Sequence, residues 1–199
     1  MAKADKQLQD DFPFYKDEKT ALFIDGANLY AATKALDFEI DYRKLLSYFS
    51  DRSHLLRANY YTLLSEDQDY SPLRPLVDWL DYNGFNIITN TIREYTDYQG
   101  RKKVKGTIGI DMAVDMMEMC GKIDHAVLFT GDTDFHALVD SAQRAGTRVT
   151  LISTIKTSPS MIADELRRQA DYFVDIADLR KHIQKNGADA MNDRQKVMA

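Results

Sequence analysis

Short apolar runs alternate with amphipathic segments along most of the chain. Runs with the length and composition of buried strands lie at 21–25, 54–64, 85–92, 125–130, 147–153 and 171–176. Apolar residues or capping signals indicate helices at 27–35, 41–49, 71–83, 110–120, 134–145, 158–170 and 177–183. Strands that alternate with helices form mostly parallel sheets with helices on both faces. The pattern therefore predicts a three-layer α/β sandwich with a mostly parallel central sheet.

The predictions of two helix starts and of one buried helix face rest on a few residues. Ser71-Pro72 and Ser158-Pro159 each place a capping residue and a proline at a helix start, and we expect the second helix to run to Ala170. In the segment 110–120, Val114 and Met117 lie at helical spacing. We expect both side chains, together with Met112 and Met116, to belong to the core.

Composition places one domain between two polar ends. The chain has 199 residues, of which 44% are hydrophobic, and this suits a single core. We expect a flexible arm at 1–19, a domain at 20–183 and a flexible tail at 184–199. The chain has one cysteine and neither a signal peptide nor an apolar stretch of the ~20 residues that a membrane helix needs. A cytoplasmic protein without a membrane span is therefore expected; its oligomeric state, including a homo-oligomer, stays open.

The net charge of -5 argues against a simple basic coat for nucleic acid. Such a chain either avoids nucleic acid or offsets its negative charge with bound cations. The positions of the acidic residues decide between these two possibilities.

Two acidic turns directly follow apolar strands. Asp25-Gly26-Ala27-Asn28 follows the first, and Thr130-Gly131-Asp132-Thr133-Asp134 follows the run 125–130. Parallel sheets bind ligands beyond the carboxyl ends of their strands. A single aspartate there is equally consistent with a helix cap. Asp132 and Asp134 are harder to explain in this way, because a cap uses one carboxylate. Three converging carboxylates favour Mg²⁺ or Mn²⁺.

Two further charged segments have open interpretations. Asp111 and Asp115 are spaced to share one helix face, either as part of the site or as a solvated surface. A basic segment leads to the same sheet edge and contains Arg93, Arg101, Lys102, Lys103 and Lys105. It either binds a phosphate backbone or forms a solvated hairpin with charged edges.

Four motifs resemble the NYN domain family, specifically its LabA-like branch. They read FIDGANLY, KGTIGIDMAVDMM, DHAVLFTGDTDFHALVDSAQRAGTRVTLIS and SMIADELRRQADYFVDI, and the resemblance covers residues 20–183. It implies a Rossmann-like fold similar to PIN-domain nucleases, several members being Mg²⁺- or Mn²⁺-dependent ribonucleases. It also implies that Asp25, Asn28, Asp132 and Asp134 belong to the metal site, with Asp115 on the intervening helix.

One position departs from the family pattern. Where LabA-like proteins usually carry an acidic residue, six positions before Asp115, this chain has Gly109. Either Asp111 replaces that carboxylate from half a turn further on, or the site is weakened. Some family members bind or regulate without cutting, so the departure bears directly on activity.

These observations favour metal-assisted hydrolysis of RNA, which we expect to be single-stranded. Asn28 would hold a metal-bound water or a phosphate oxygen, and the aspartates would hold Mg²⁺ or Mn²⁺. One alternative is a non-catalytic RNA-binding or regulatory module, which Gly109 favours. Another is a metal-dependent phosphatase on small phosphate esters.

Overall fold

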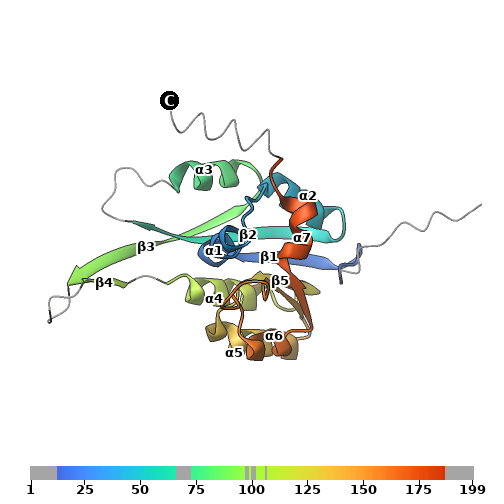
Figure 1. Ribbon diagram of the computed structural model, residues 1–199. Coiled ribbons are helices and arrows are strands. Elements are labelled where there is room, and N and C mark those ends of the chain that lie inside the picture. Colours follow the sequence, from blue (N-terminus) through green and yellow to red (C-terminus); the bar gives the residue numbers. More distant parts are fainter. Residues whose placement is uncertain (1–12, 66–72, 97–98, 100–101, 106, 187–199) are drawn as a thin grey trace, which may run out of the picture.

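The computed structural model describes residues 13–65, 73–96, 99, 102–105 and 107–186. Within them, seven strands form one sheet in the order β4-β3-β2-β1-β5-β6-β7 (Figure 1). The strands are β1 (Lys19–Asp25), β2 (His54–Ser65), β3 (Asn86–Thr96), β4 (Lys102–Lys105), β5 (His125–Phe129), β6 (Arg148–Ser153) and β7 (Tyr172–Asp175). All neighbours are parallel except β4, which pairs antiparallel with β3. The predicted mostly parallel sheet is confirmed.

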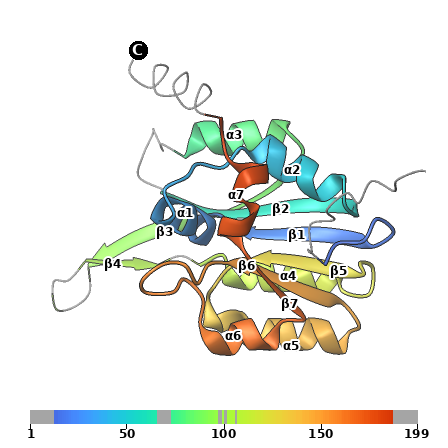
Figure 2. The same ribbon diagram turned by 45° about the vertical axis from the view of Figure 1, so that its right-hand side comes forward.

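Helices cover both faces of the sheet, which gives the three expected layers. They are α1 (Gly26–Ala35), α2 (Tyr42–Ser50), α3 (Arg74–Tyr82), α4 (Gly109–Met119), α5 (His136–Arg144), α6 (Asp164–Gln169) and α7 (Ile176–Ile183), with a 3-10 turn at Thr133–Phe135. Figures 1 and 2 show α1, α2, α3 and α7 on one side and α4, α5 and α6 on the other. Among the described residues, no helix has the length and apolar character that crossing a bilayer requires.

Two cores follow from the alternation of side chains along the strands. In β1, Leu22 and Ile24 pack under α1, α2 and α7, whereas Ala21 and Phe23 pack under α4 and α5. All four side chains are fully buried. Because helices cover both faces, a central strand is apolar at successive positions rather than at alternate ones. This explains why the sequence shows the strands as continuous apolar runs.

The segment 158–170 is not one helix, and this prediction was wrong. α6 begins only at Asp164, because Ala163 is extended, with φ −74° and ψ 143°. The Ser160 hydroxyl donates to the carbonyl oxygen of Ile162 (2.8 Å) and accepts from its backbone N–H (3.3 Å). Ile162 is buried in the core. These contacts hold the preceding residues as a loop. The predicted helix start at Ser71-Pro72 lies outside the described residues.

α4 buries two of the four side chains that we expected in the core. Met112 and Met116 are fully buried, whereas Val114 is 51% exposed and Met117 is 40% exposed. The helix carries apolar side chains on two faces, and the sheet covers only one of them. Ile110, which lies on the uncovered side, is 68% exposed.

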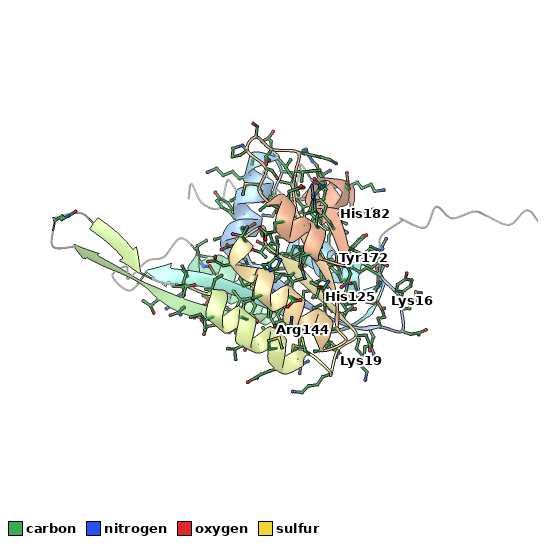
Figure 3. The ribbon with its side chains drawn as sticks, turned by 90° about the horizontal axis from the view of Figure 1, so that it is seen from below. Lys16, Lys19, His125, Arg144, Tyr172 and His182 are labelled. Carbon is green, nitrogen blue, oxygen red and sulfur yellow. The ribbon has the colours of Figure 1, made fainter. Side chains whose placement is uncertain are left out.

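Residues 13–18, expected as the end of a flexible arm, contact the domain. The Phe14 ring stacks on His125 with 5.6 Å between the ring centroids. Glu18 forms an ion pair with Arg148, whose guanidinium also donates to the carbonyl oxygen of Pro13. Apolar stacking and charge pairing therefore hold this segment against the domain, and the flexible arm stays a prediction for residues 1–12, outside the described residues. Figure 3 labels neighbouring residues Lys16, Lys19 and Tyr172 at this end, away from the β3–β4 hairpin.

The first residues of the expected C-terminal tail are also held by the domain. Lys44 Nζ donates to the Gln184 carbonyl oxygen and to Asn186 Oδ1, both at 2.9 Å. The Lys185 N–H donates to the carbonyl oxygen of Glu39 (2.9 Å). A flexible tail is therefore a prediction for residues 187–199, which lie outside the described residues.

Candidate active site

The first acidic turn directly joins β1 to α1. Asp25 is extended (φ −71°, ψ 102°), and its Oδ1 accepts the backbone N–H of Asn28 at 3.0 Å. It therefore caps α1, and this cap occupies one of its two carboxylate oxygens. A Cβ on the next residue, Gly26, would lie 2.6 Å from the Tyr60 ring. Glycine allows the chain to turn this closely against β2.

The second acidic turn joins β5 to α5. Asp132 Oδ1 accepts the Asp134 N–H at 3.0 Å, so Asp132 caps the 3-10 turn. The Asp132 N–H in turn donates to Thr130 Oγ1 (3.2 Å). A Cβ on Gly131 would lie 1.8 Å from the Met161 carbonyl oxygen. The loop after β6 therefore presses directly on this turn and fixes its position.

The two turns meet in one cavity of about 660 Å³ between the strand ends and helices α4 and α5. Asp25, Asp132 and Asp134 all line it. β1 and β5 are adjacent parallel strands, so their carboxyl ends lie side by side. All three residues therefore lie at the same edge of the sheet, and the metal site expected there stays a prediction. The rest of the lining is mostly apolar and comes from α4 and α5.

Negative charge in this cavity has no basic partner among the residues that the structure describes. Burial is the main cause that raises the pKa of Asp25, and the charge of Asp132 adds to it. Hydrogen bonds from the Asn28 and Ala27 amides oppose the rise. Among the described residues, no ion pair joins Asp25, Asp132 or Asp134 to lysine or arginine.

The carboxylates are not gathered into a preformed metal site. Among the described residues, no group of three or more His, Cys, Asp or Glu side chains is close enough to hold a metal ion. Two of the three carboxylates turn one oxygen toward a backbone N–H, and like charges keep apart without a cation between them. The donors are all oxygen atoms, the type that Mg²⁺ and Mn²⁺ prefer.

The other acidic candidates lie on α4 and are held by neutral donors. Asp115 Oδ2 accepts from the Tyr61 hydroxyl (2.9 Å), and Asp111 Oδ2 accepts from Asn90 Nδ2 (3.3 Å). Neither carboxylate is among the described residues that line the cavity, but Gly109 is. The side chain of Asn28 is not among the lining residues either.

Tyr61 contacts one of the candidate residues, and the sequence analysis missed this contact. It is fully buried in β2, and it pairs with Asp25 across the β1–β2 ladder. Burial is the main cause that raises its pKa, and the hydrogen bond to Asp115 adds to it. The hydroxyl is therefore a stable donor that fixes one orientation of Asp115. The adjacent pair Tyr60-Tyr61 was visible in the strand, but no local pattern links Tyr61 to Asp115, 54 residues later.

The basic segment forms an antiparallel hairpin. Arg93 lies in β3 opposite Lys105 in β4, and Lys102 and Lys103 follow in the same ladder. The pairing of β3 with β2 ends at Ile92, so the hairpin extends past the carboxyl end of the parallel sheet (Figure 1). This is the same end as the acidic turns. Arg101 lies outside the described residues, and phosphate binding by this segment stays a prediction.

Known proteins with similar sequences or folds cover most of the chain. A model of the NYN domain matches residues 19–177. The low amplitude and bright protein LabA of Synechococcus elongatus is 31% identical over 175 residues, which are 86% of this chain and 90% of that protein. The crystal structure of a protein of unknown function from Vibrio parahaemolyticus has a TM-score of 0.69 at 23% identity and covers 85% of this chain and 97% of its own. This structural match concerns the fold alone.

Proposed function

The chain belongs to the NYN domain family, and from this premise we propose that it is a divalent-metal-dependent nuclease that hydrolyses phosphodiester bonds in RNA. One observation carries the proposal: Asp25, Asp132 and Asp134 line one cavity without a basic partner among the described residues. Capping explains one oxygen of Asp25 and one of Asp132. It explains neither the remaining oxygens nor the presence of Asp134.

A divalent cation fits this set of donors. Asp25, Asp132 and Asp134 would hold it, since each has an oxygen that no cap uses. When bound, Mg²⁺ or Mn²⁺ neutralises charge on the scissile phosphate and lowers the pKa of a bound water. The turns contribute rigid placement, because Gly131 is pressed against Met161 and Gly26 against Tyr60. Rigid placement keeps the carboxylates near one another despite their repulsion.

Other residues of the chain would position the substrate. We propose that Asn28 would contact the phosphate, and that Asp115, oriented by the Tyr61 hydroxyl, would support the site from α4. The hairpin residues Arg93, Arg101, Lys102, Lys103 and Lys105 would contact the RNA backbone as it leaves the cavity. The substrate we propose is single-stranded RNA in the cytoplasm.

A nuclease assay with matched variants tests this function. We expect cleavage of RNA in Mg²⁺ or Mn²⁺ and none in EDTA, with single-stranded DNA and a small phosphate ester as competing substrates. Asp132→Asn is expected to lower the cleavage rate by ~10²-fold or more, as the loss of a key electrostatic group does in other enzymes. Asp41→Asn is the control, because Asp41 also caps a helix, at α2, outside the cavity. Equal rates in both variants would refute the site.

A second candidate function is RNA binding without cleavage, and Gly109 is the observation that favours it. Gly109 lines the cavity at the position where the family pattern has a carboxylate, while Asp111 pairs with Asn90. The substitution Gly109→Asp is sterically acceptable, because a Cβ there would meet Thr107 and Phe135 only at ordinary contact distances of 3.5 Å and more. Gly109 does not have a positive φ.

The two functions predict different outcomes for Gly109→Asp and Asp111→Asn. If the site lacks a ligand, Gly109→Asp raises metal affinity or cleavage, and Asp111→Asn is nearly silent. If Asp111 supplies the ligand, Asp111→Asn is as damaging as Asp132→Asn, and Gly109→Asp adds little. Calorimetric titration with Mn²⁺ and the cleavage assay, run on both variants, decide between them.

A further inference from the structure

We propose that the apolar half of the active-site cavity binds an unpaired nucleobase of the nucleic acid next to the aspartates. We call this half the base trough: Ile110, Ala113 and Met117 of α4 face Ala137 and Leu138 of α5. The inference rests on the proposed function for the identity of the ligand. The trough itself is defined by apolar surface that the core does not cover.

The α4 wall of the trough is apolar although it faces outward. Ile110, Ala113 and Met117 are spaced by three and four positions, so they share one helix face. Ile110 is 68% exposed and Met117 is 40% exposed. Large apolar side chains that stay in contact with water beside a cluster of carboxylates do not add to the stability of the fold. Such a surface is typical of a ligand site.

The opposite wall is built from small and buried side chains. Ala137 is exposed at the start of α5, and Leu138 behind it is buried. α4 and α5 pack against each other. Ala113 on α4 and Ala137 on α5 have small side chains, so a gap remains between the two helices where they line the cavity. The trough is therefore a gap with apolar walls, continuous with the acidic half of the same cavity.

The two halves of the cavity together fit a nucleotide. The phosphate of a nucleotide would bind the cation that the aspartates would hold. Its base has flat faces, which lose few interactions with water when apolar side chains cover them. The whole cavity of about 660 Å³ has the size of a site for a small ligand, and a partner helix would need a longer groove. A nucleotide is therefore the occupant that matches both the charge and the size.

The trough implies selection for unpaired nucleotides. A base inside a duplex is stacked and paired, so it enters a side pocket only after it is flipped out of the helix. An unpaired base enters without this cost. Few polar side chains line the trough, so we expect weak discrimination among the four bases.

Binding measurements on paired variants test the trough. The probe is a short single-stranded RNA with one 2-aminopurine, titrated in Ca²⁺, which takes the same oxygen ligands as Mg²⁺. The larger side chain in Ala137→Leu fills the gap, and Ile110→Ser removes apolar surface from the α4 wall. Each substitution is expected to weaken RNA binding about fivefold or more, which is the lower end of the effect expected for losing the contacts to one base. Val114→Ser is the control, because Val114 is exposed on α4 but is not among the residues that line the cavity.

Each outcome of the experiment bears on the proposal. Weaker binding in both trough variants, with Val114→Ser unchanged and melting temperatures preserved, supports it, as does weaker binding of the same sequence as a duplex. Unchanged affinity and unchanged 2-aminopurine fluorescence in Ala137→Leu would overturn it. An equal loss in Val114→Ser would overturn it too, because the whole exposed face of α4 would then be a partner surface. These readouts are independent of cleavage, so a protein that binds but does not cut refutes the proposed activity and leaves the trough standing.

Discussion

At the amino end of the sheet, Arg148 is surrounded by partners, whereas at the carboxyl end no basic residue among those described lies between Asp25 and Asp132. Arg148 pairs with Glu18 and lies over the rings of Tyr15 and Tyr172, with 4.8 Å and 5.2 Å to the centroids. Among the described residues, no comparable cation faces Asp25 or Asp132.

The amino end also fixes the state of a buried histidine. Arg148 Nη2 lies 3.2 Å from His125 Nδ1, and a guanidinium only donates. Nδ1 must therefore accept, and Nε2 carries the proton and donates to Thr150 Oγ1 at 2.7 Å. Burial, with Arg148 as a second cause, lowers the pKa of His125 to about 3. His125 is thus neutral at pH 7, and its contact with Glu18 is not an ion pair.

The difference between the two ends supports the proposed site. The amino end pairs the charge of Arg148 with Glu18 and with aromatic rings of the same chain, which is what stability alone selects. The carboxyl end keeps crowded carboxylates and exposed apolar side chains, which cost stability in the free protein. A site that binds a cation and a nucleotide explains both features together.

The largest effect is expected from Gly131→Ala, which tests how tightly the carboxyl end is held. The new Cβ would lie 1.8 Å from the Met161 carbonyl oxygen, so the turn or the loop must move. We expect a loss of ~3 kcal/mol or more in unfolding free energy, as for other overpacking changes in rigid surroundings. Gly146→Ala is the control: its Cβ meets nothing within 4 Å. Its φ of +85° alone costs ~1 kcal/mol. Equal losses in chemical denaturation would contradict the tight packing.

The next effect, ranked by its size per pH unit, concerns the amino end and is a pH dependence of the unfolding free energy. The native pKa of His125, about 3, lies below its ordinary value of 6.5, so the unfolded chain binds the proton first as the pH falls. Between pH 6.5 and 3 this histidine therefore removes about 1.4 kcal/mol of stability per pH unit. His125→Gln is expected to flatten the pH profile of the unfolding free energy by that slope. His54→Gln, at an exposed histidine, is the matched control.

Tyr61→Phe tests whether the carboxyl end is organised for more than packing. Removing the hydroxyl that donates to Asp115 is expected to cost ~1 kcal/mol of stability. It is also expected to lower metal affinity or the cleavage rate. Tyr42→Phe removes a similar buried hydroxyl, which lies 3.4 Å from that of Tyr60 on the other face of the sheet. It is expected to cost stability only. Identical metal affinities in the two variants would show that Tyr61 has only a structural role.

The smallest effect is a gain of stability from Asp25→Asn in the metal-free protein. Burial and the charge of Asp132 raise the pKa of Asp25, so ionisation of this carboxyl destabilises the native state as the pH rises above 3.8. Asparagine keeps the helix cap and removes the charge. We expect an increase of a few tenths to ~1 kcal/mol at pH 7, the range of partly exposed charge pairs, and none below pH 3.8. If Asp25→Asn melts at a lower temperature than Asp41→Asn at pH 7, the negative charge of Asp25 is compensated in the native protein.

The two acidic turns were predictable because their chemistry is local. A strand that ends in Asp-Gly or Gly-Asp must turn at the sheet edge, and strand alternation with helices makes the sheet parallel. The position of Asp25 and Asp132 on one edge follows from these two facts. Their role as caps was visible as an alternative, and the structure shows that each aspartate does cap.

Contacts between distant segments were decided only by the tertiary structure. α4 has two apolar faces, and its sequence does not say which one the sheet covers; packing selected Met112 and Met116 and left Ile110 on the outside. Two contacts join residues from different elements. One is the hydrogen bond from Tyr61 to Asp115, and the other is the close approach of the Met161 carbonyl oxygen to Gly131. Local periodicity carries no information about such pairs, because they depend on how the helices are positioned on the sheet. The sequence by itself therefore determined most of the helices and strands and the acidic edge. Tertiary packing decided the loop before α6 and the shape of the cavity beside that edge.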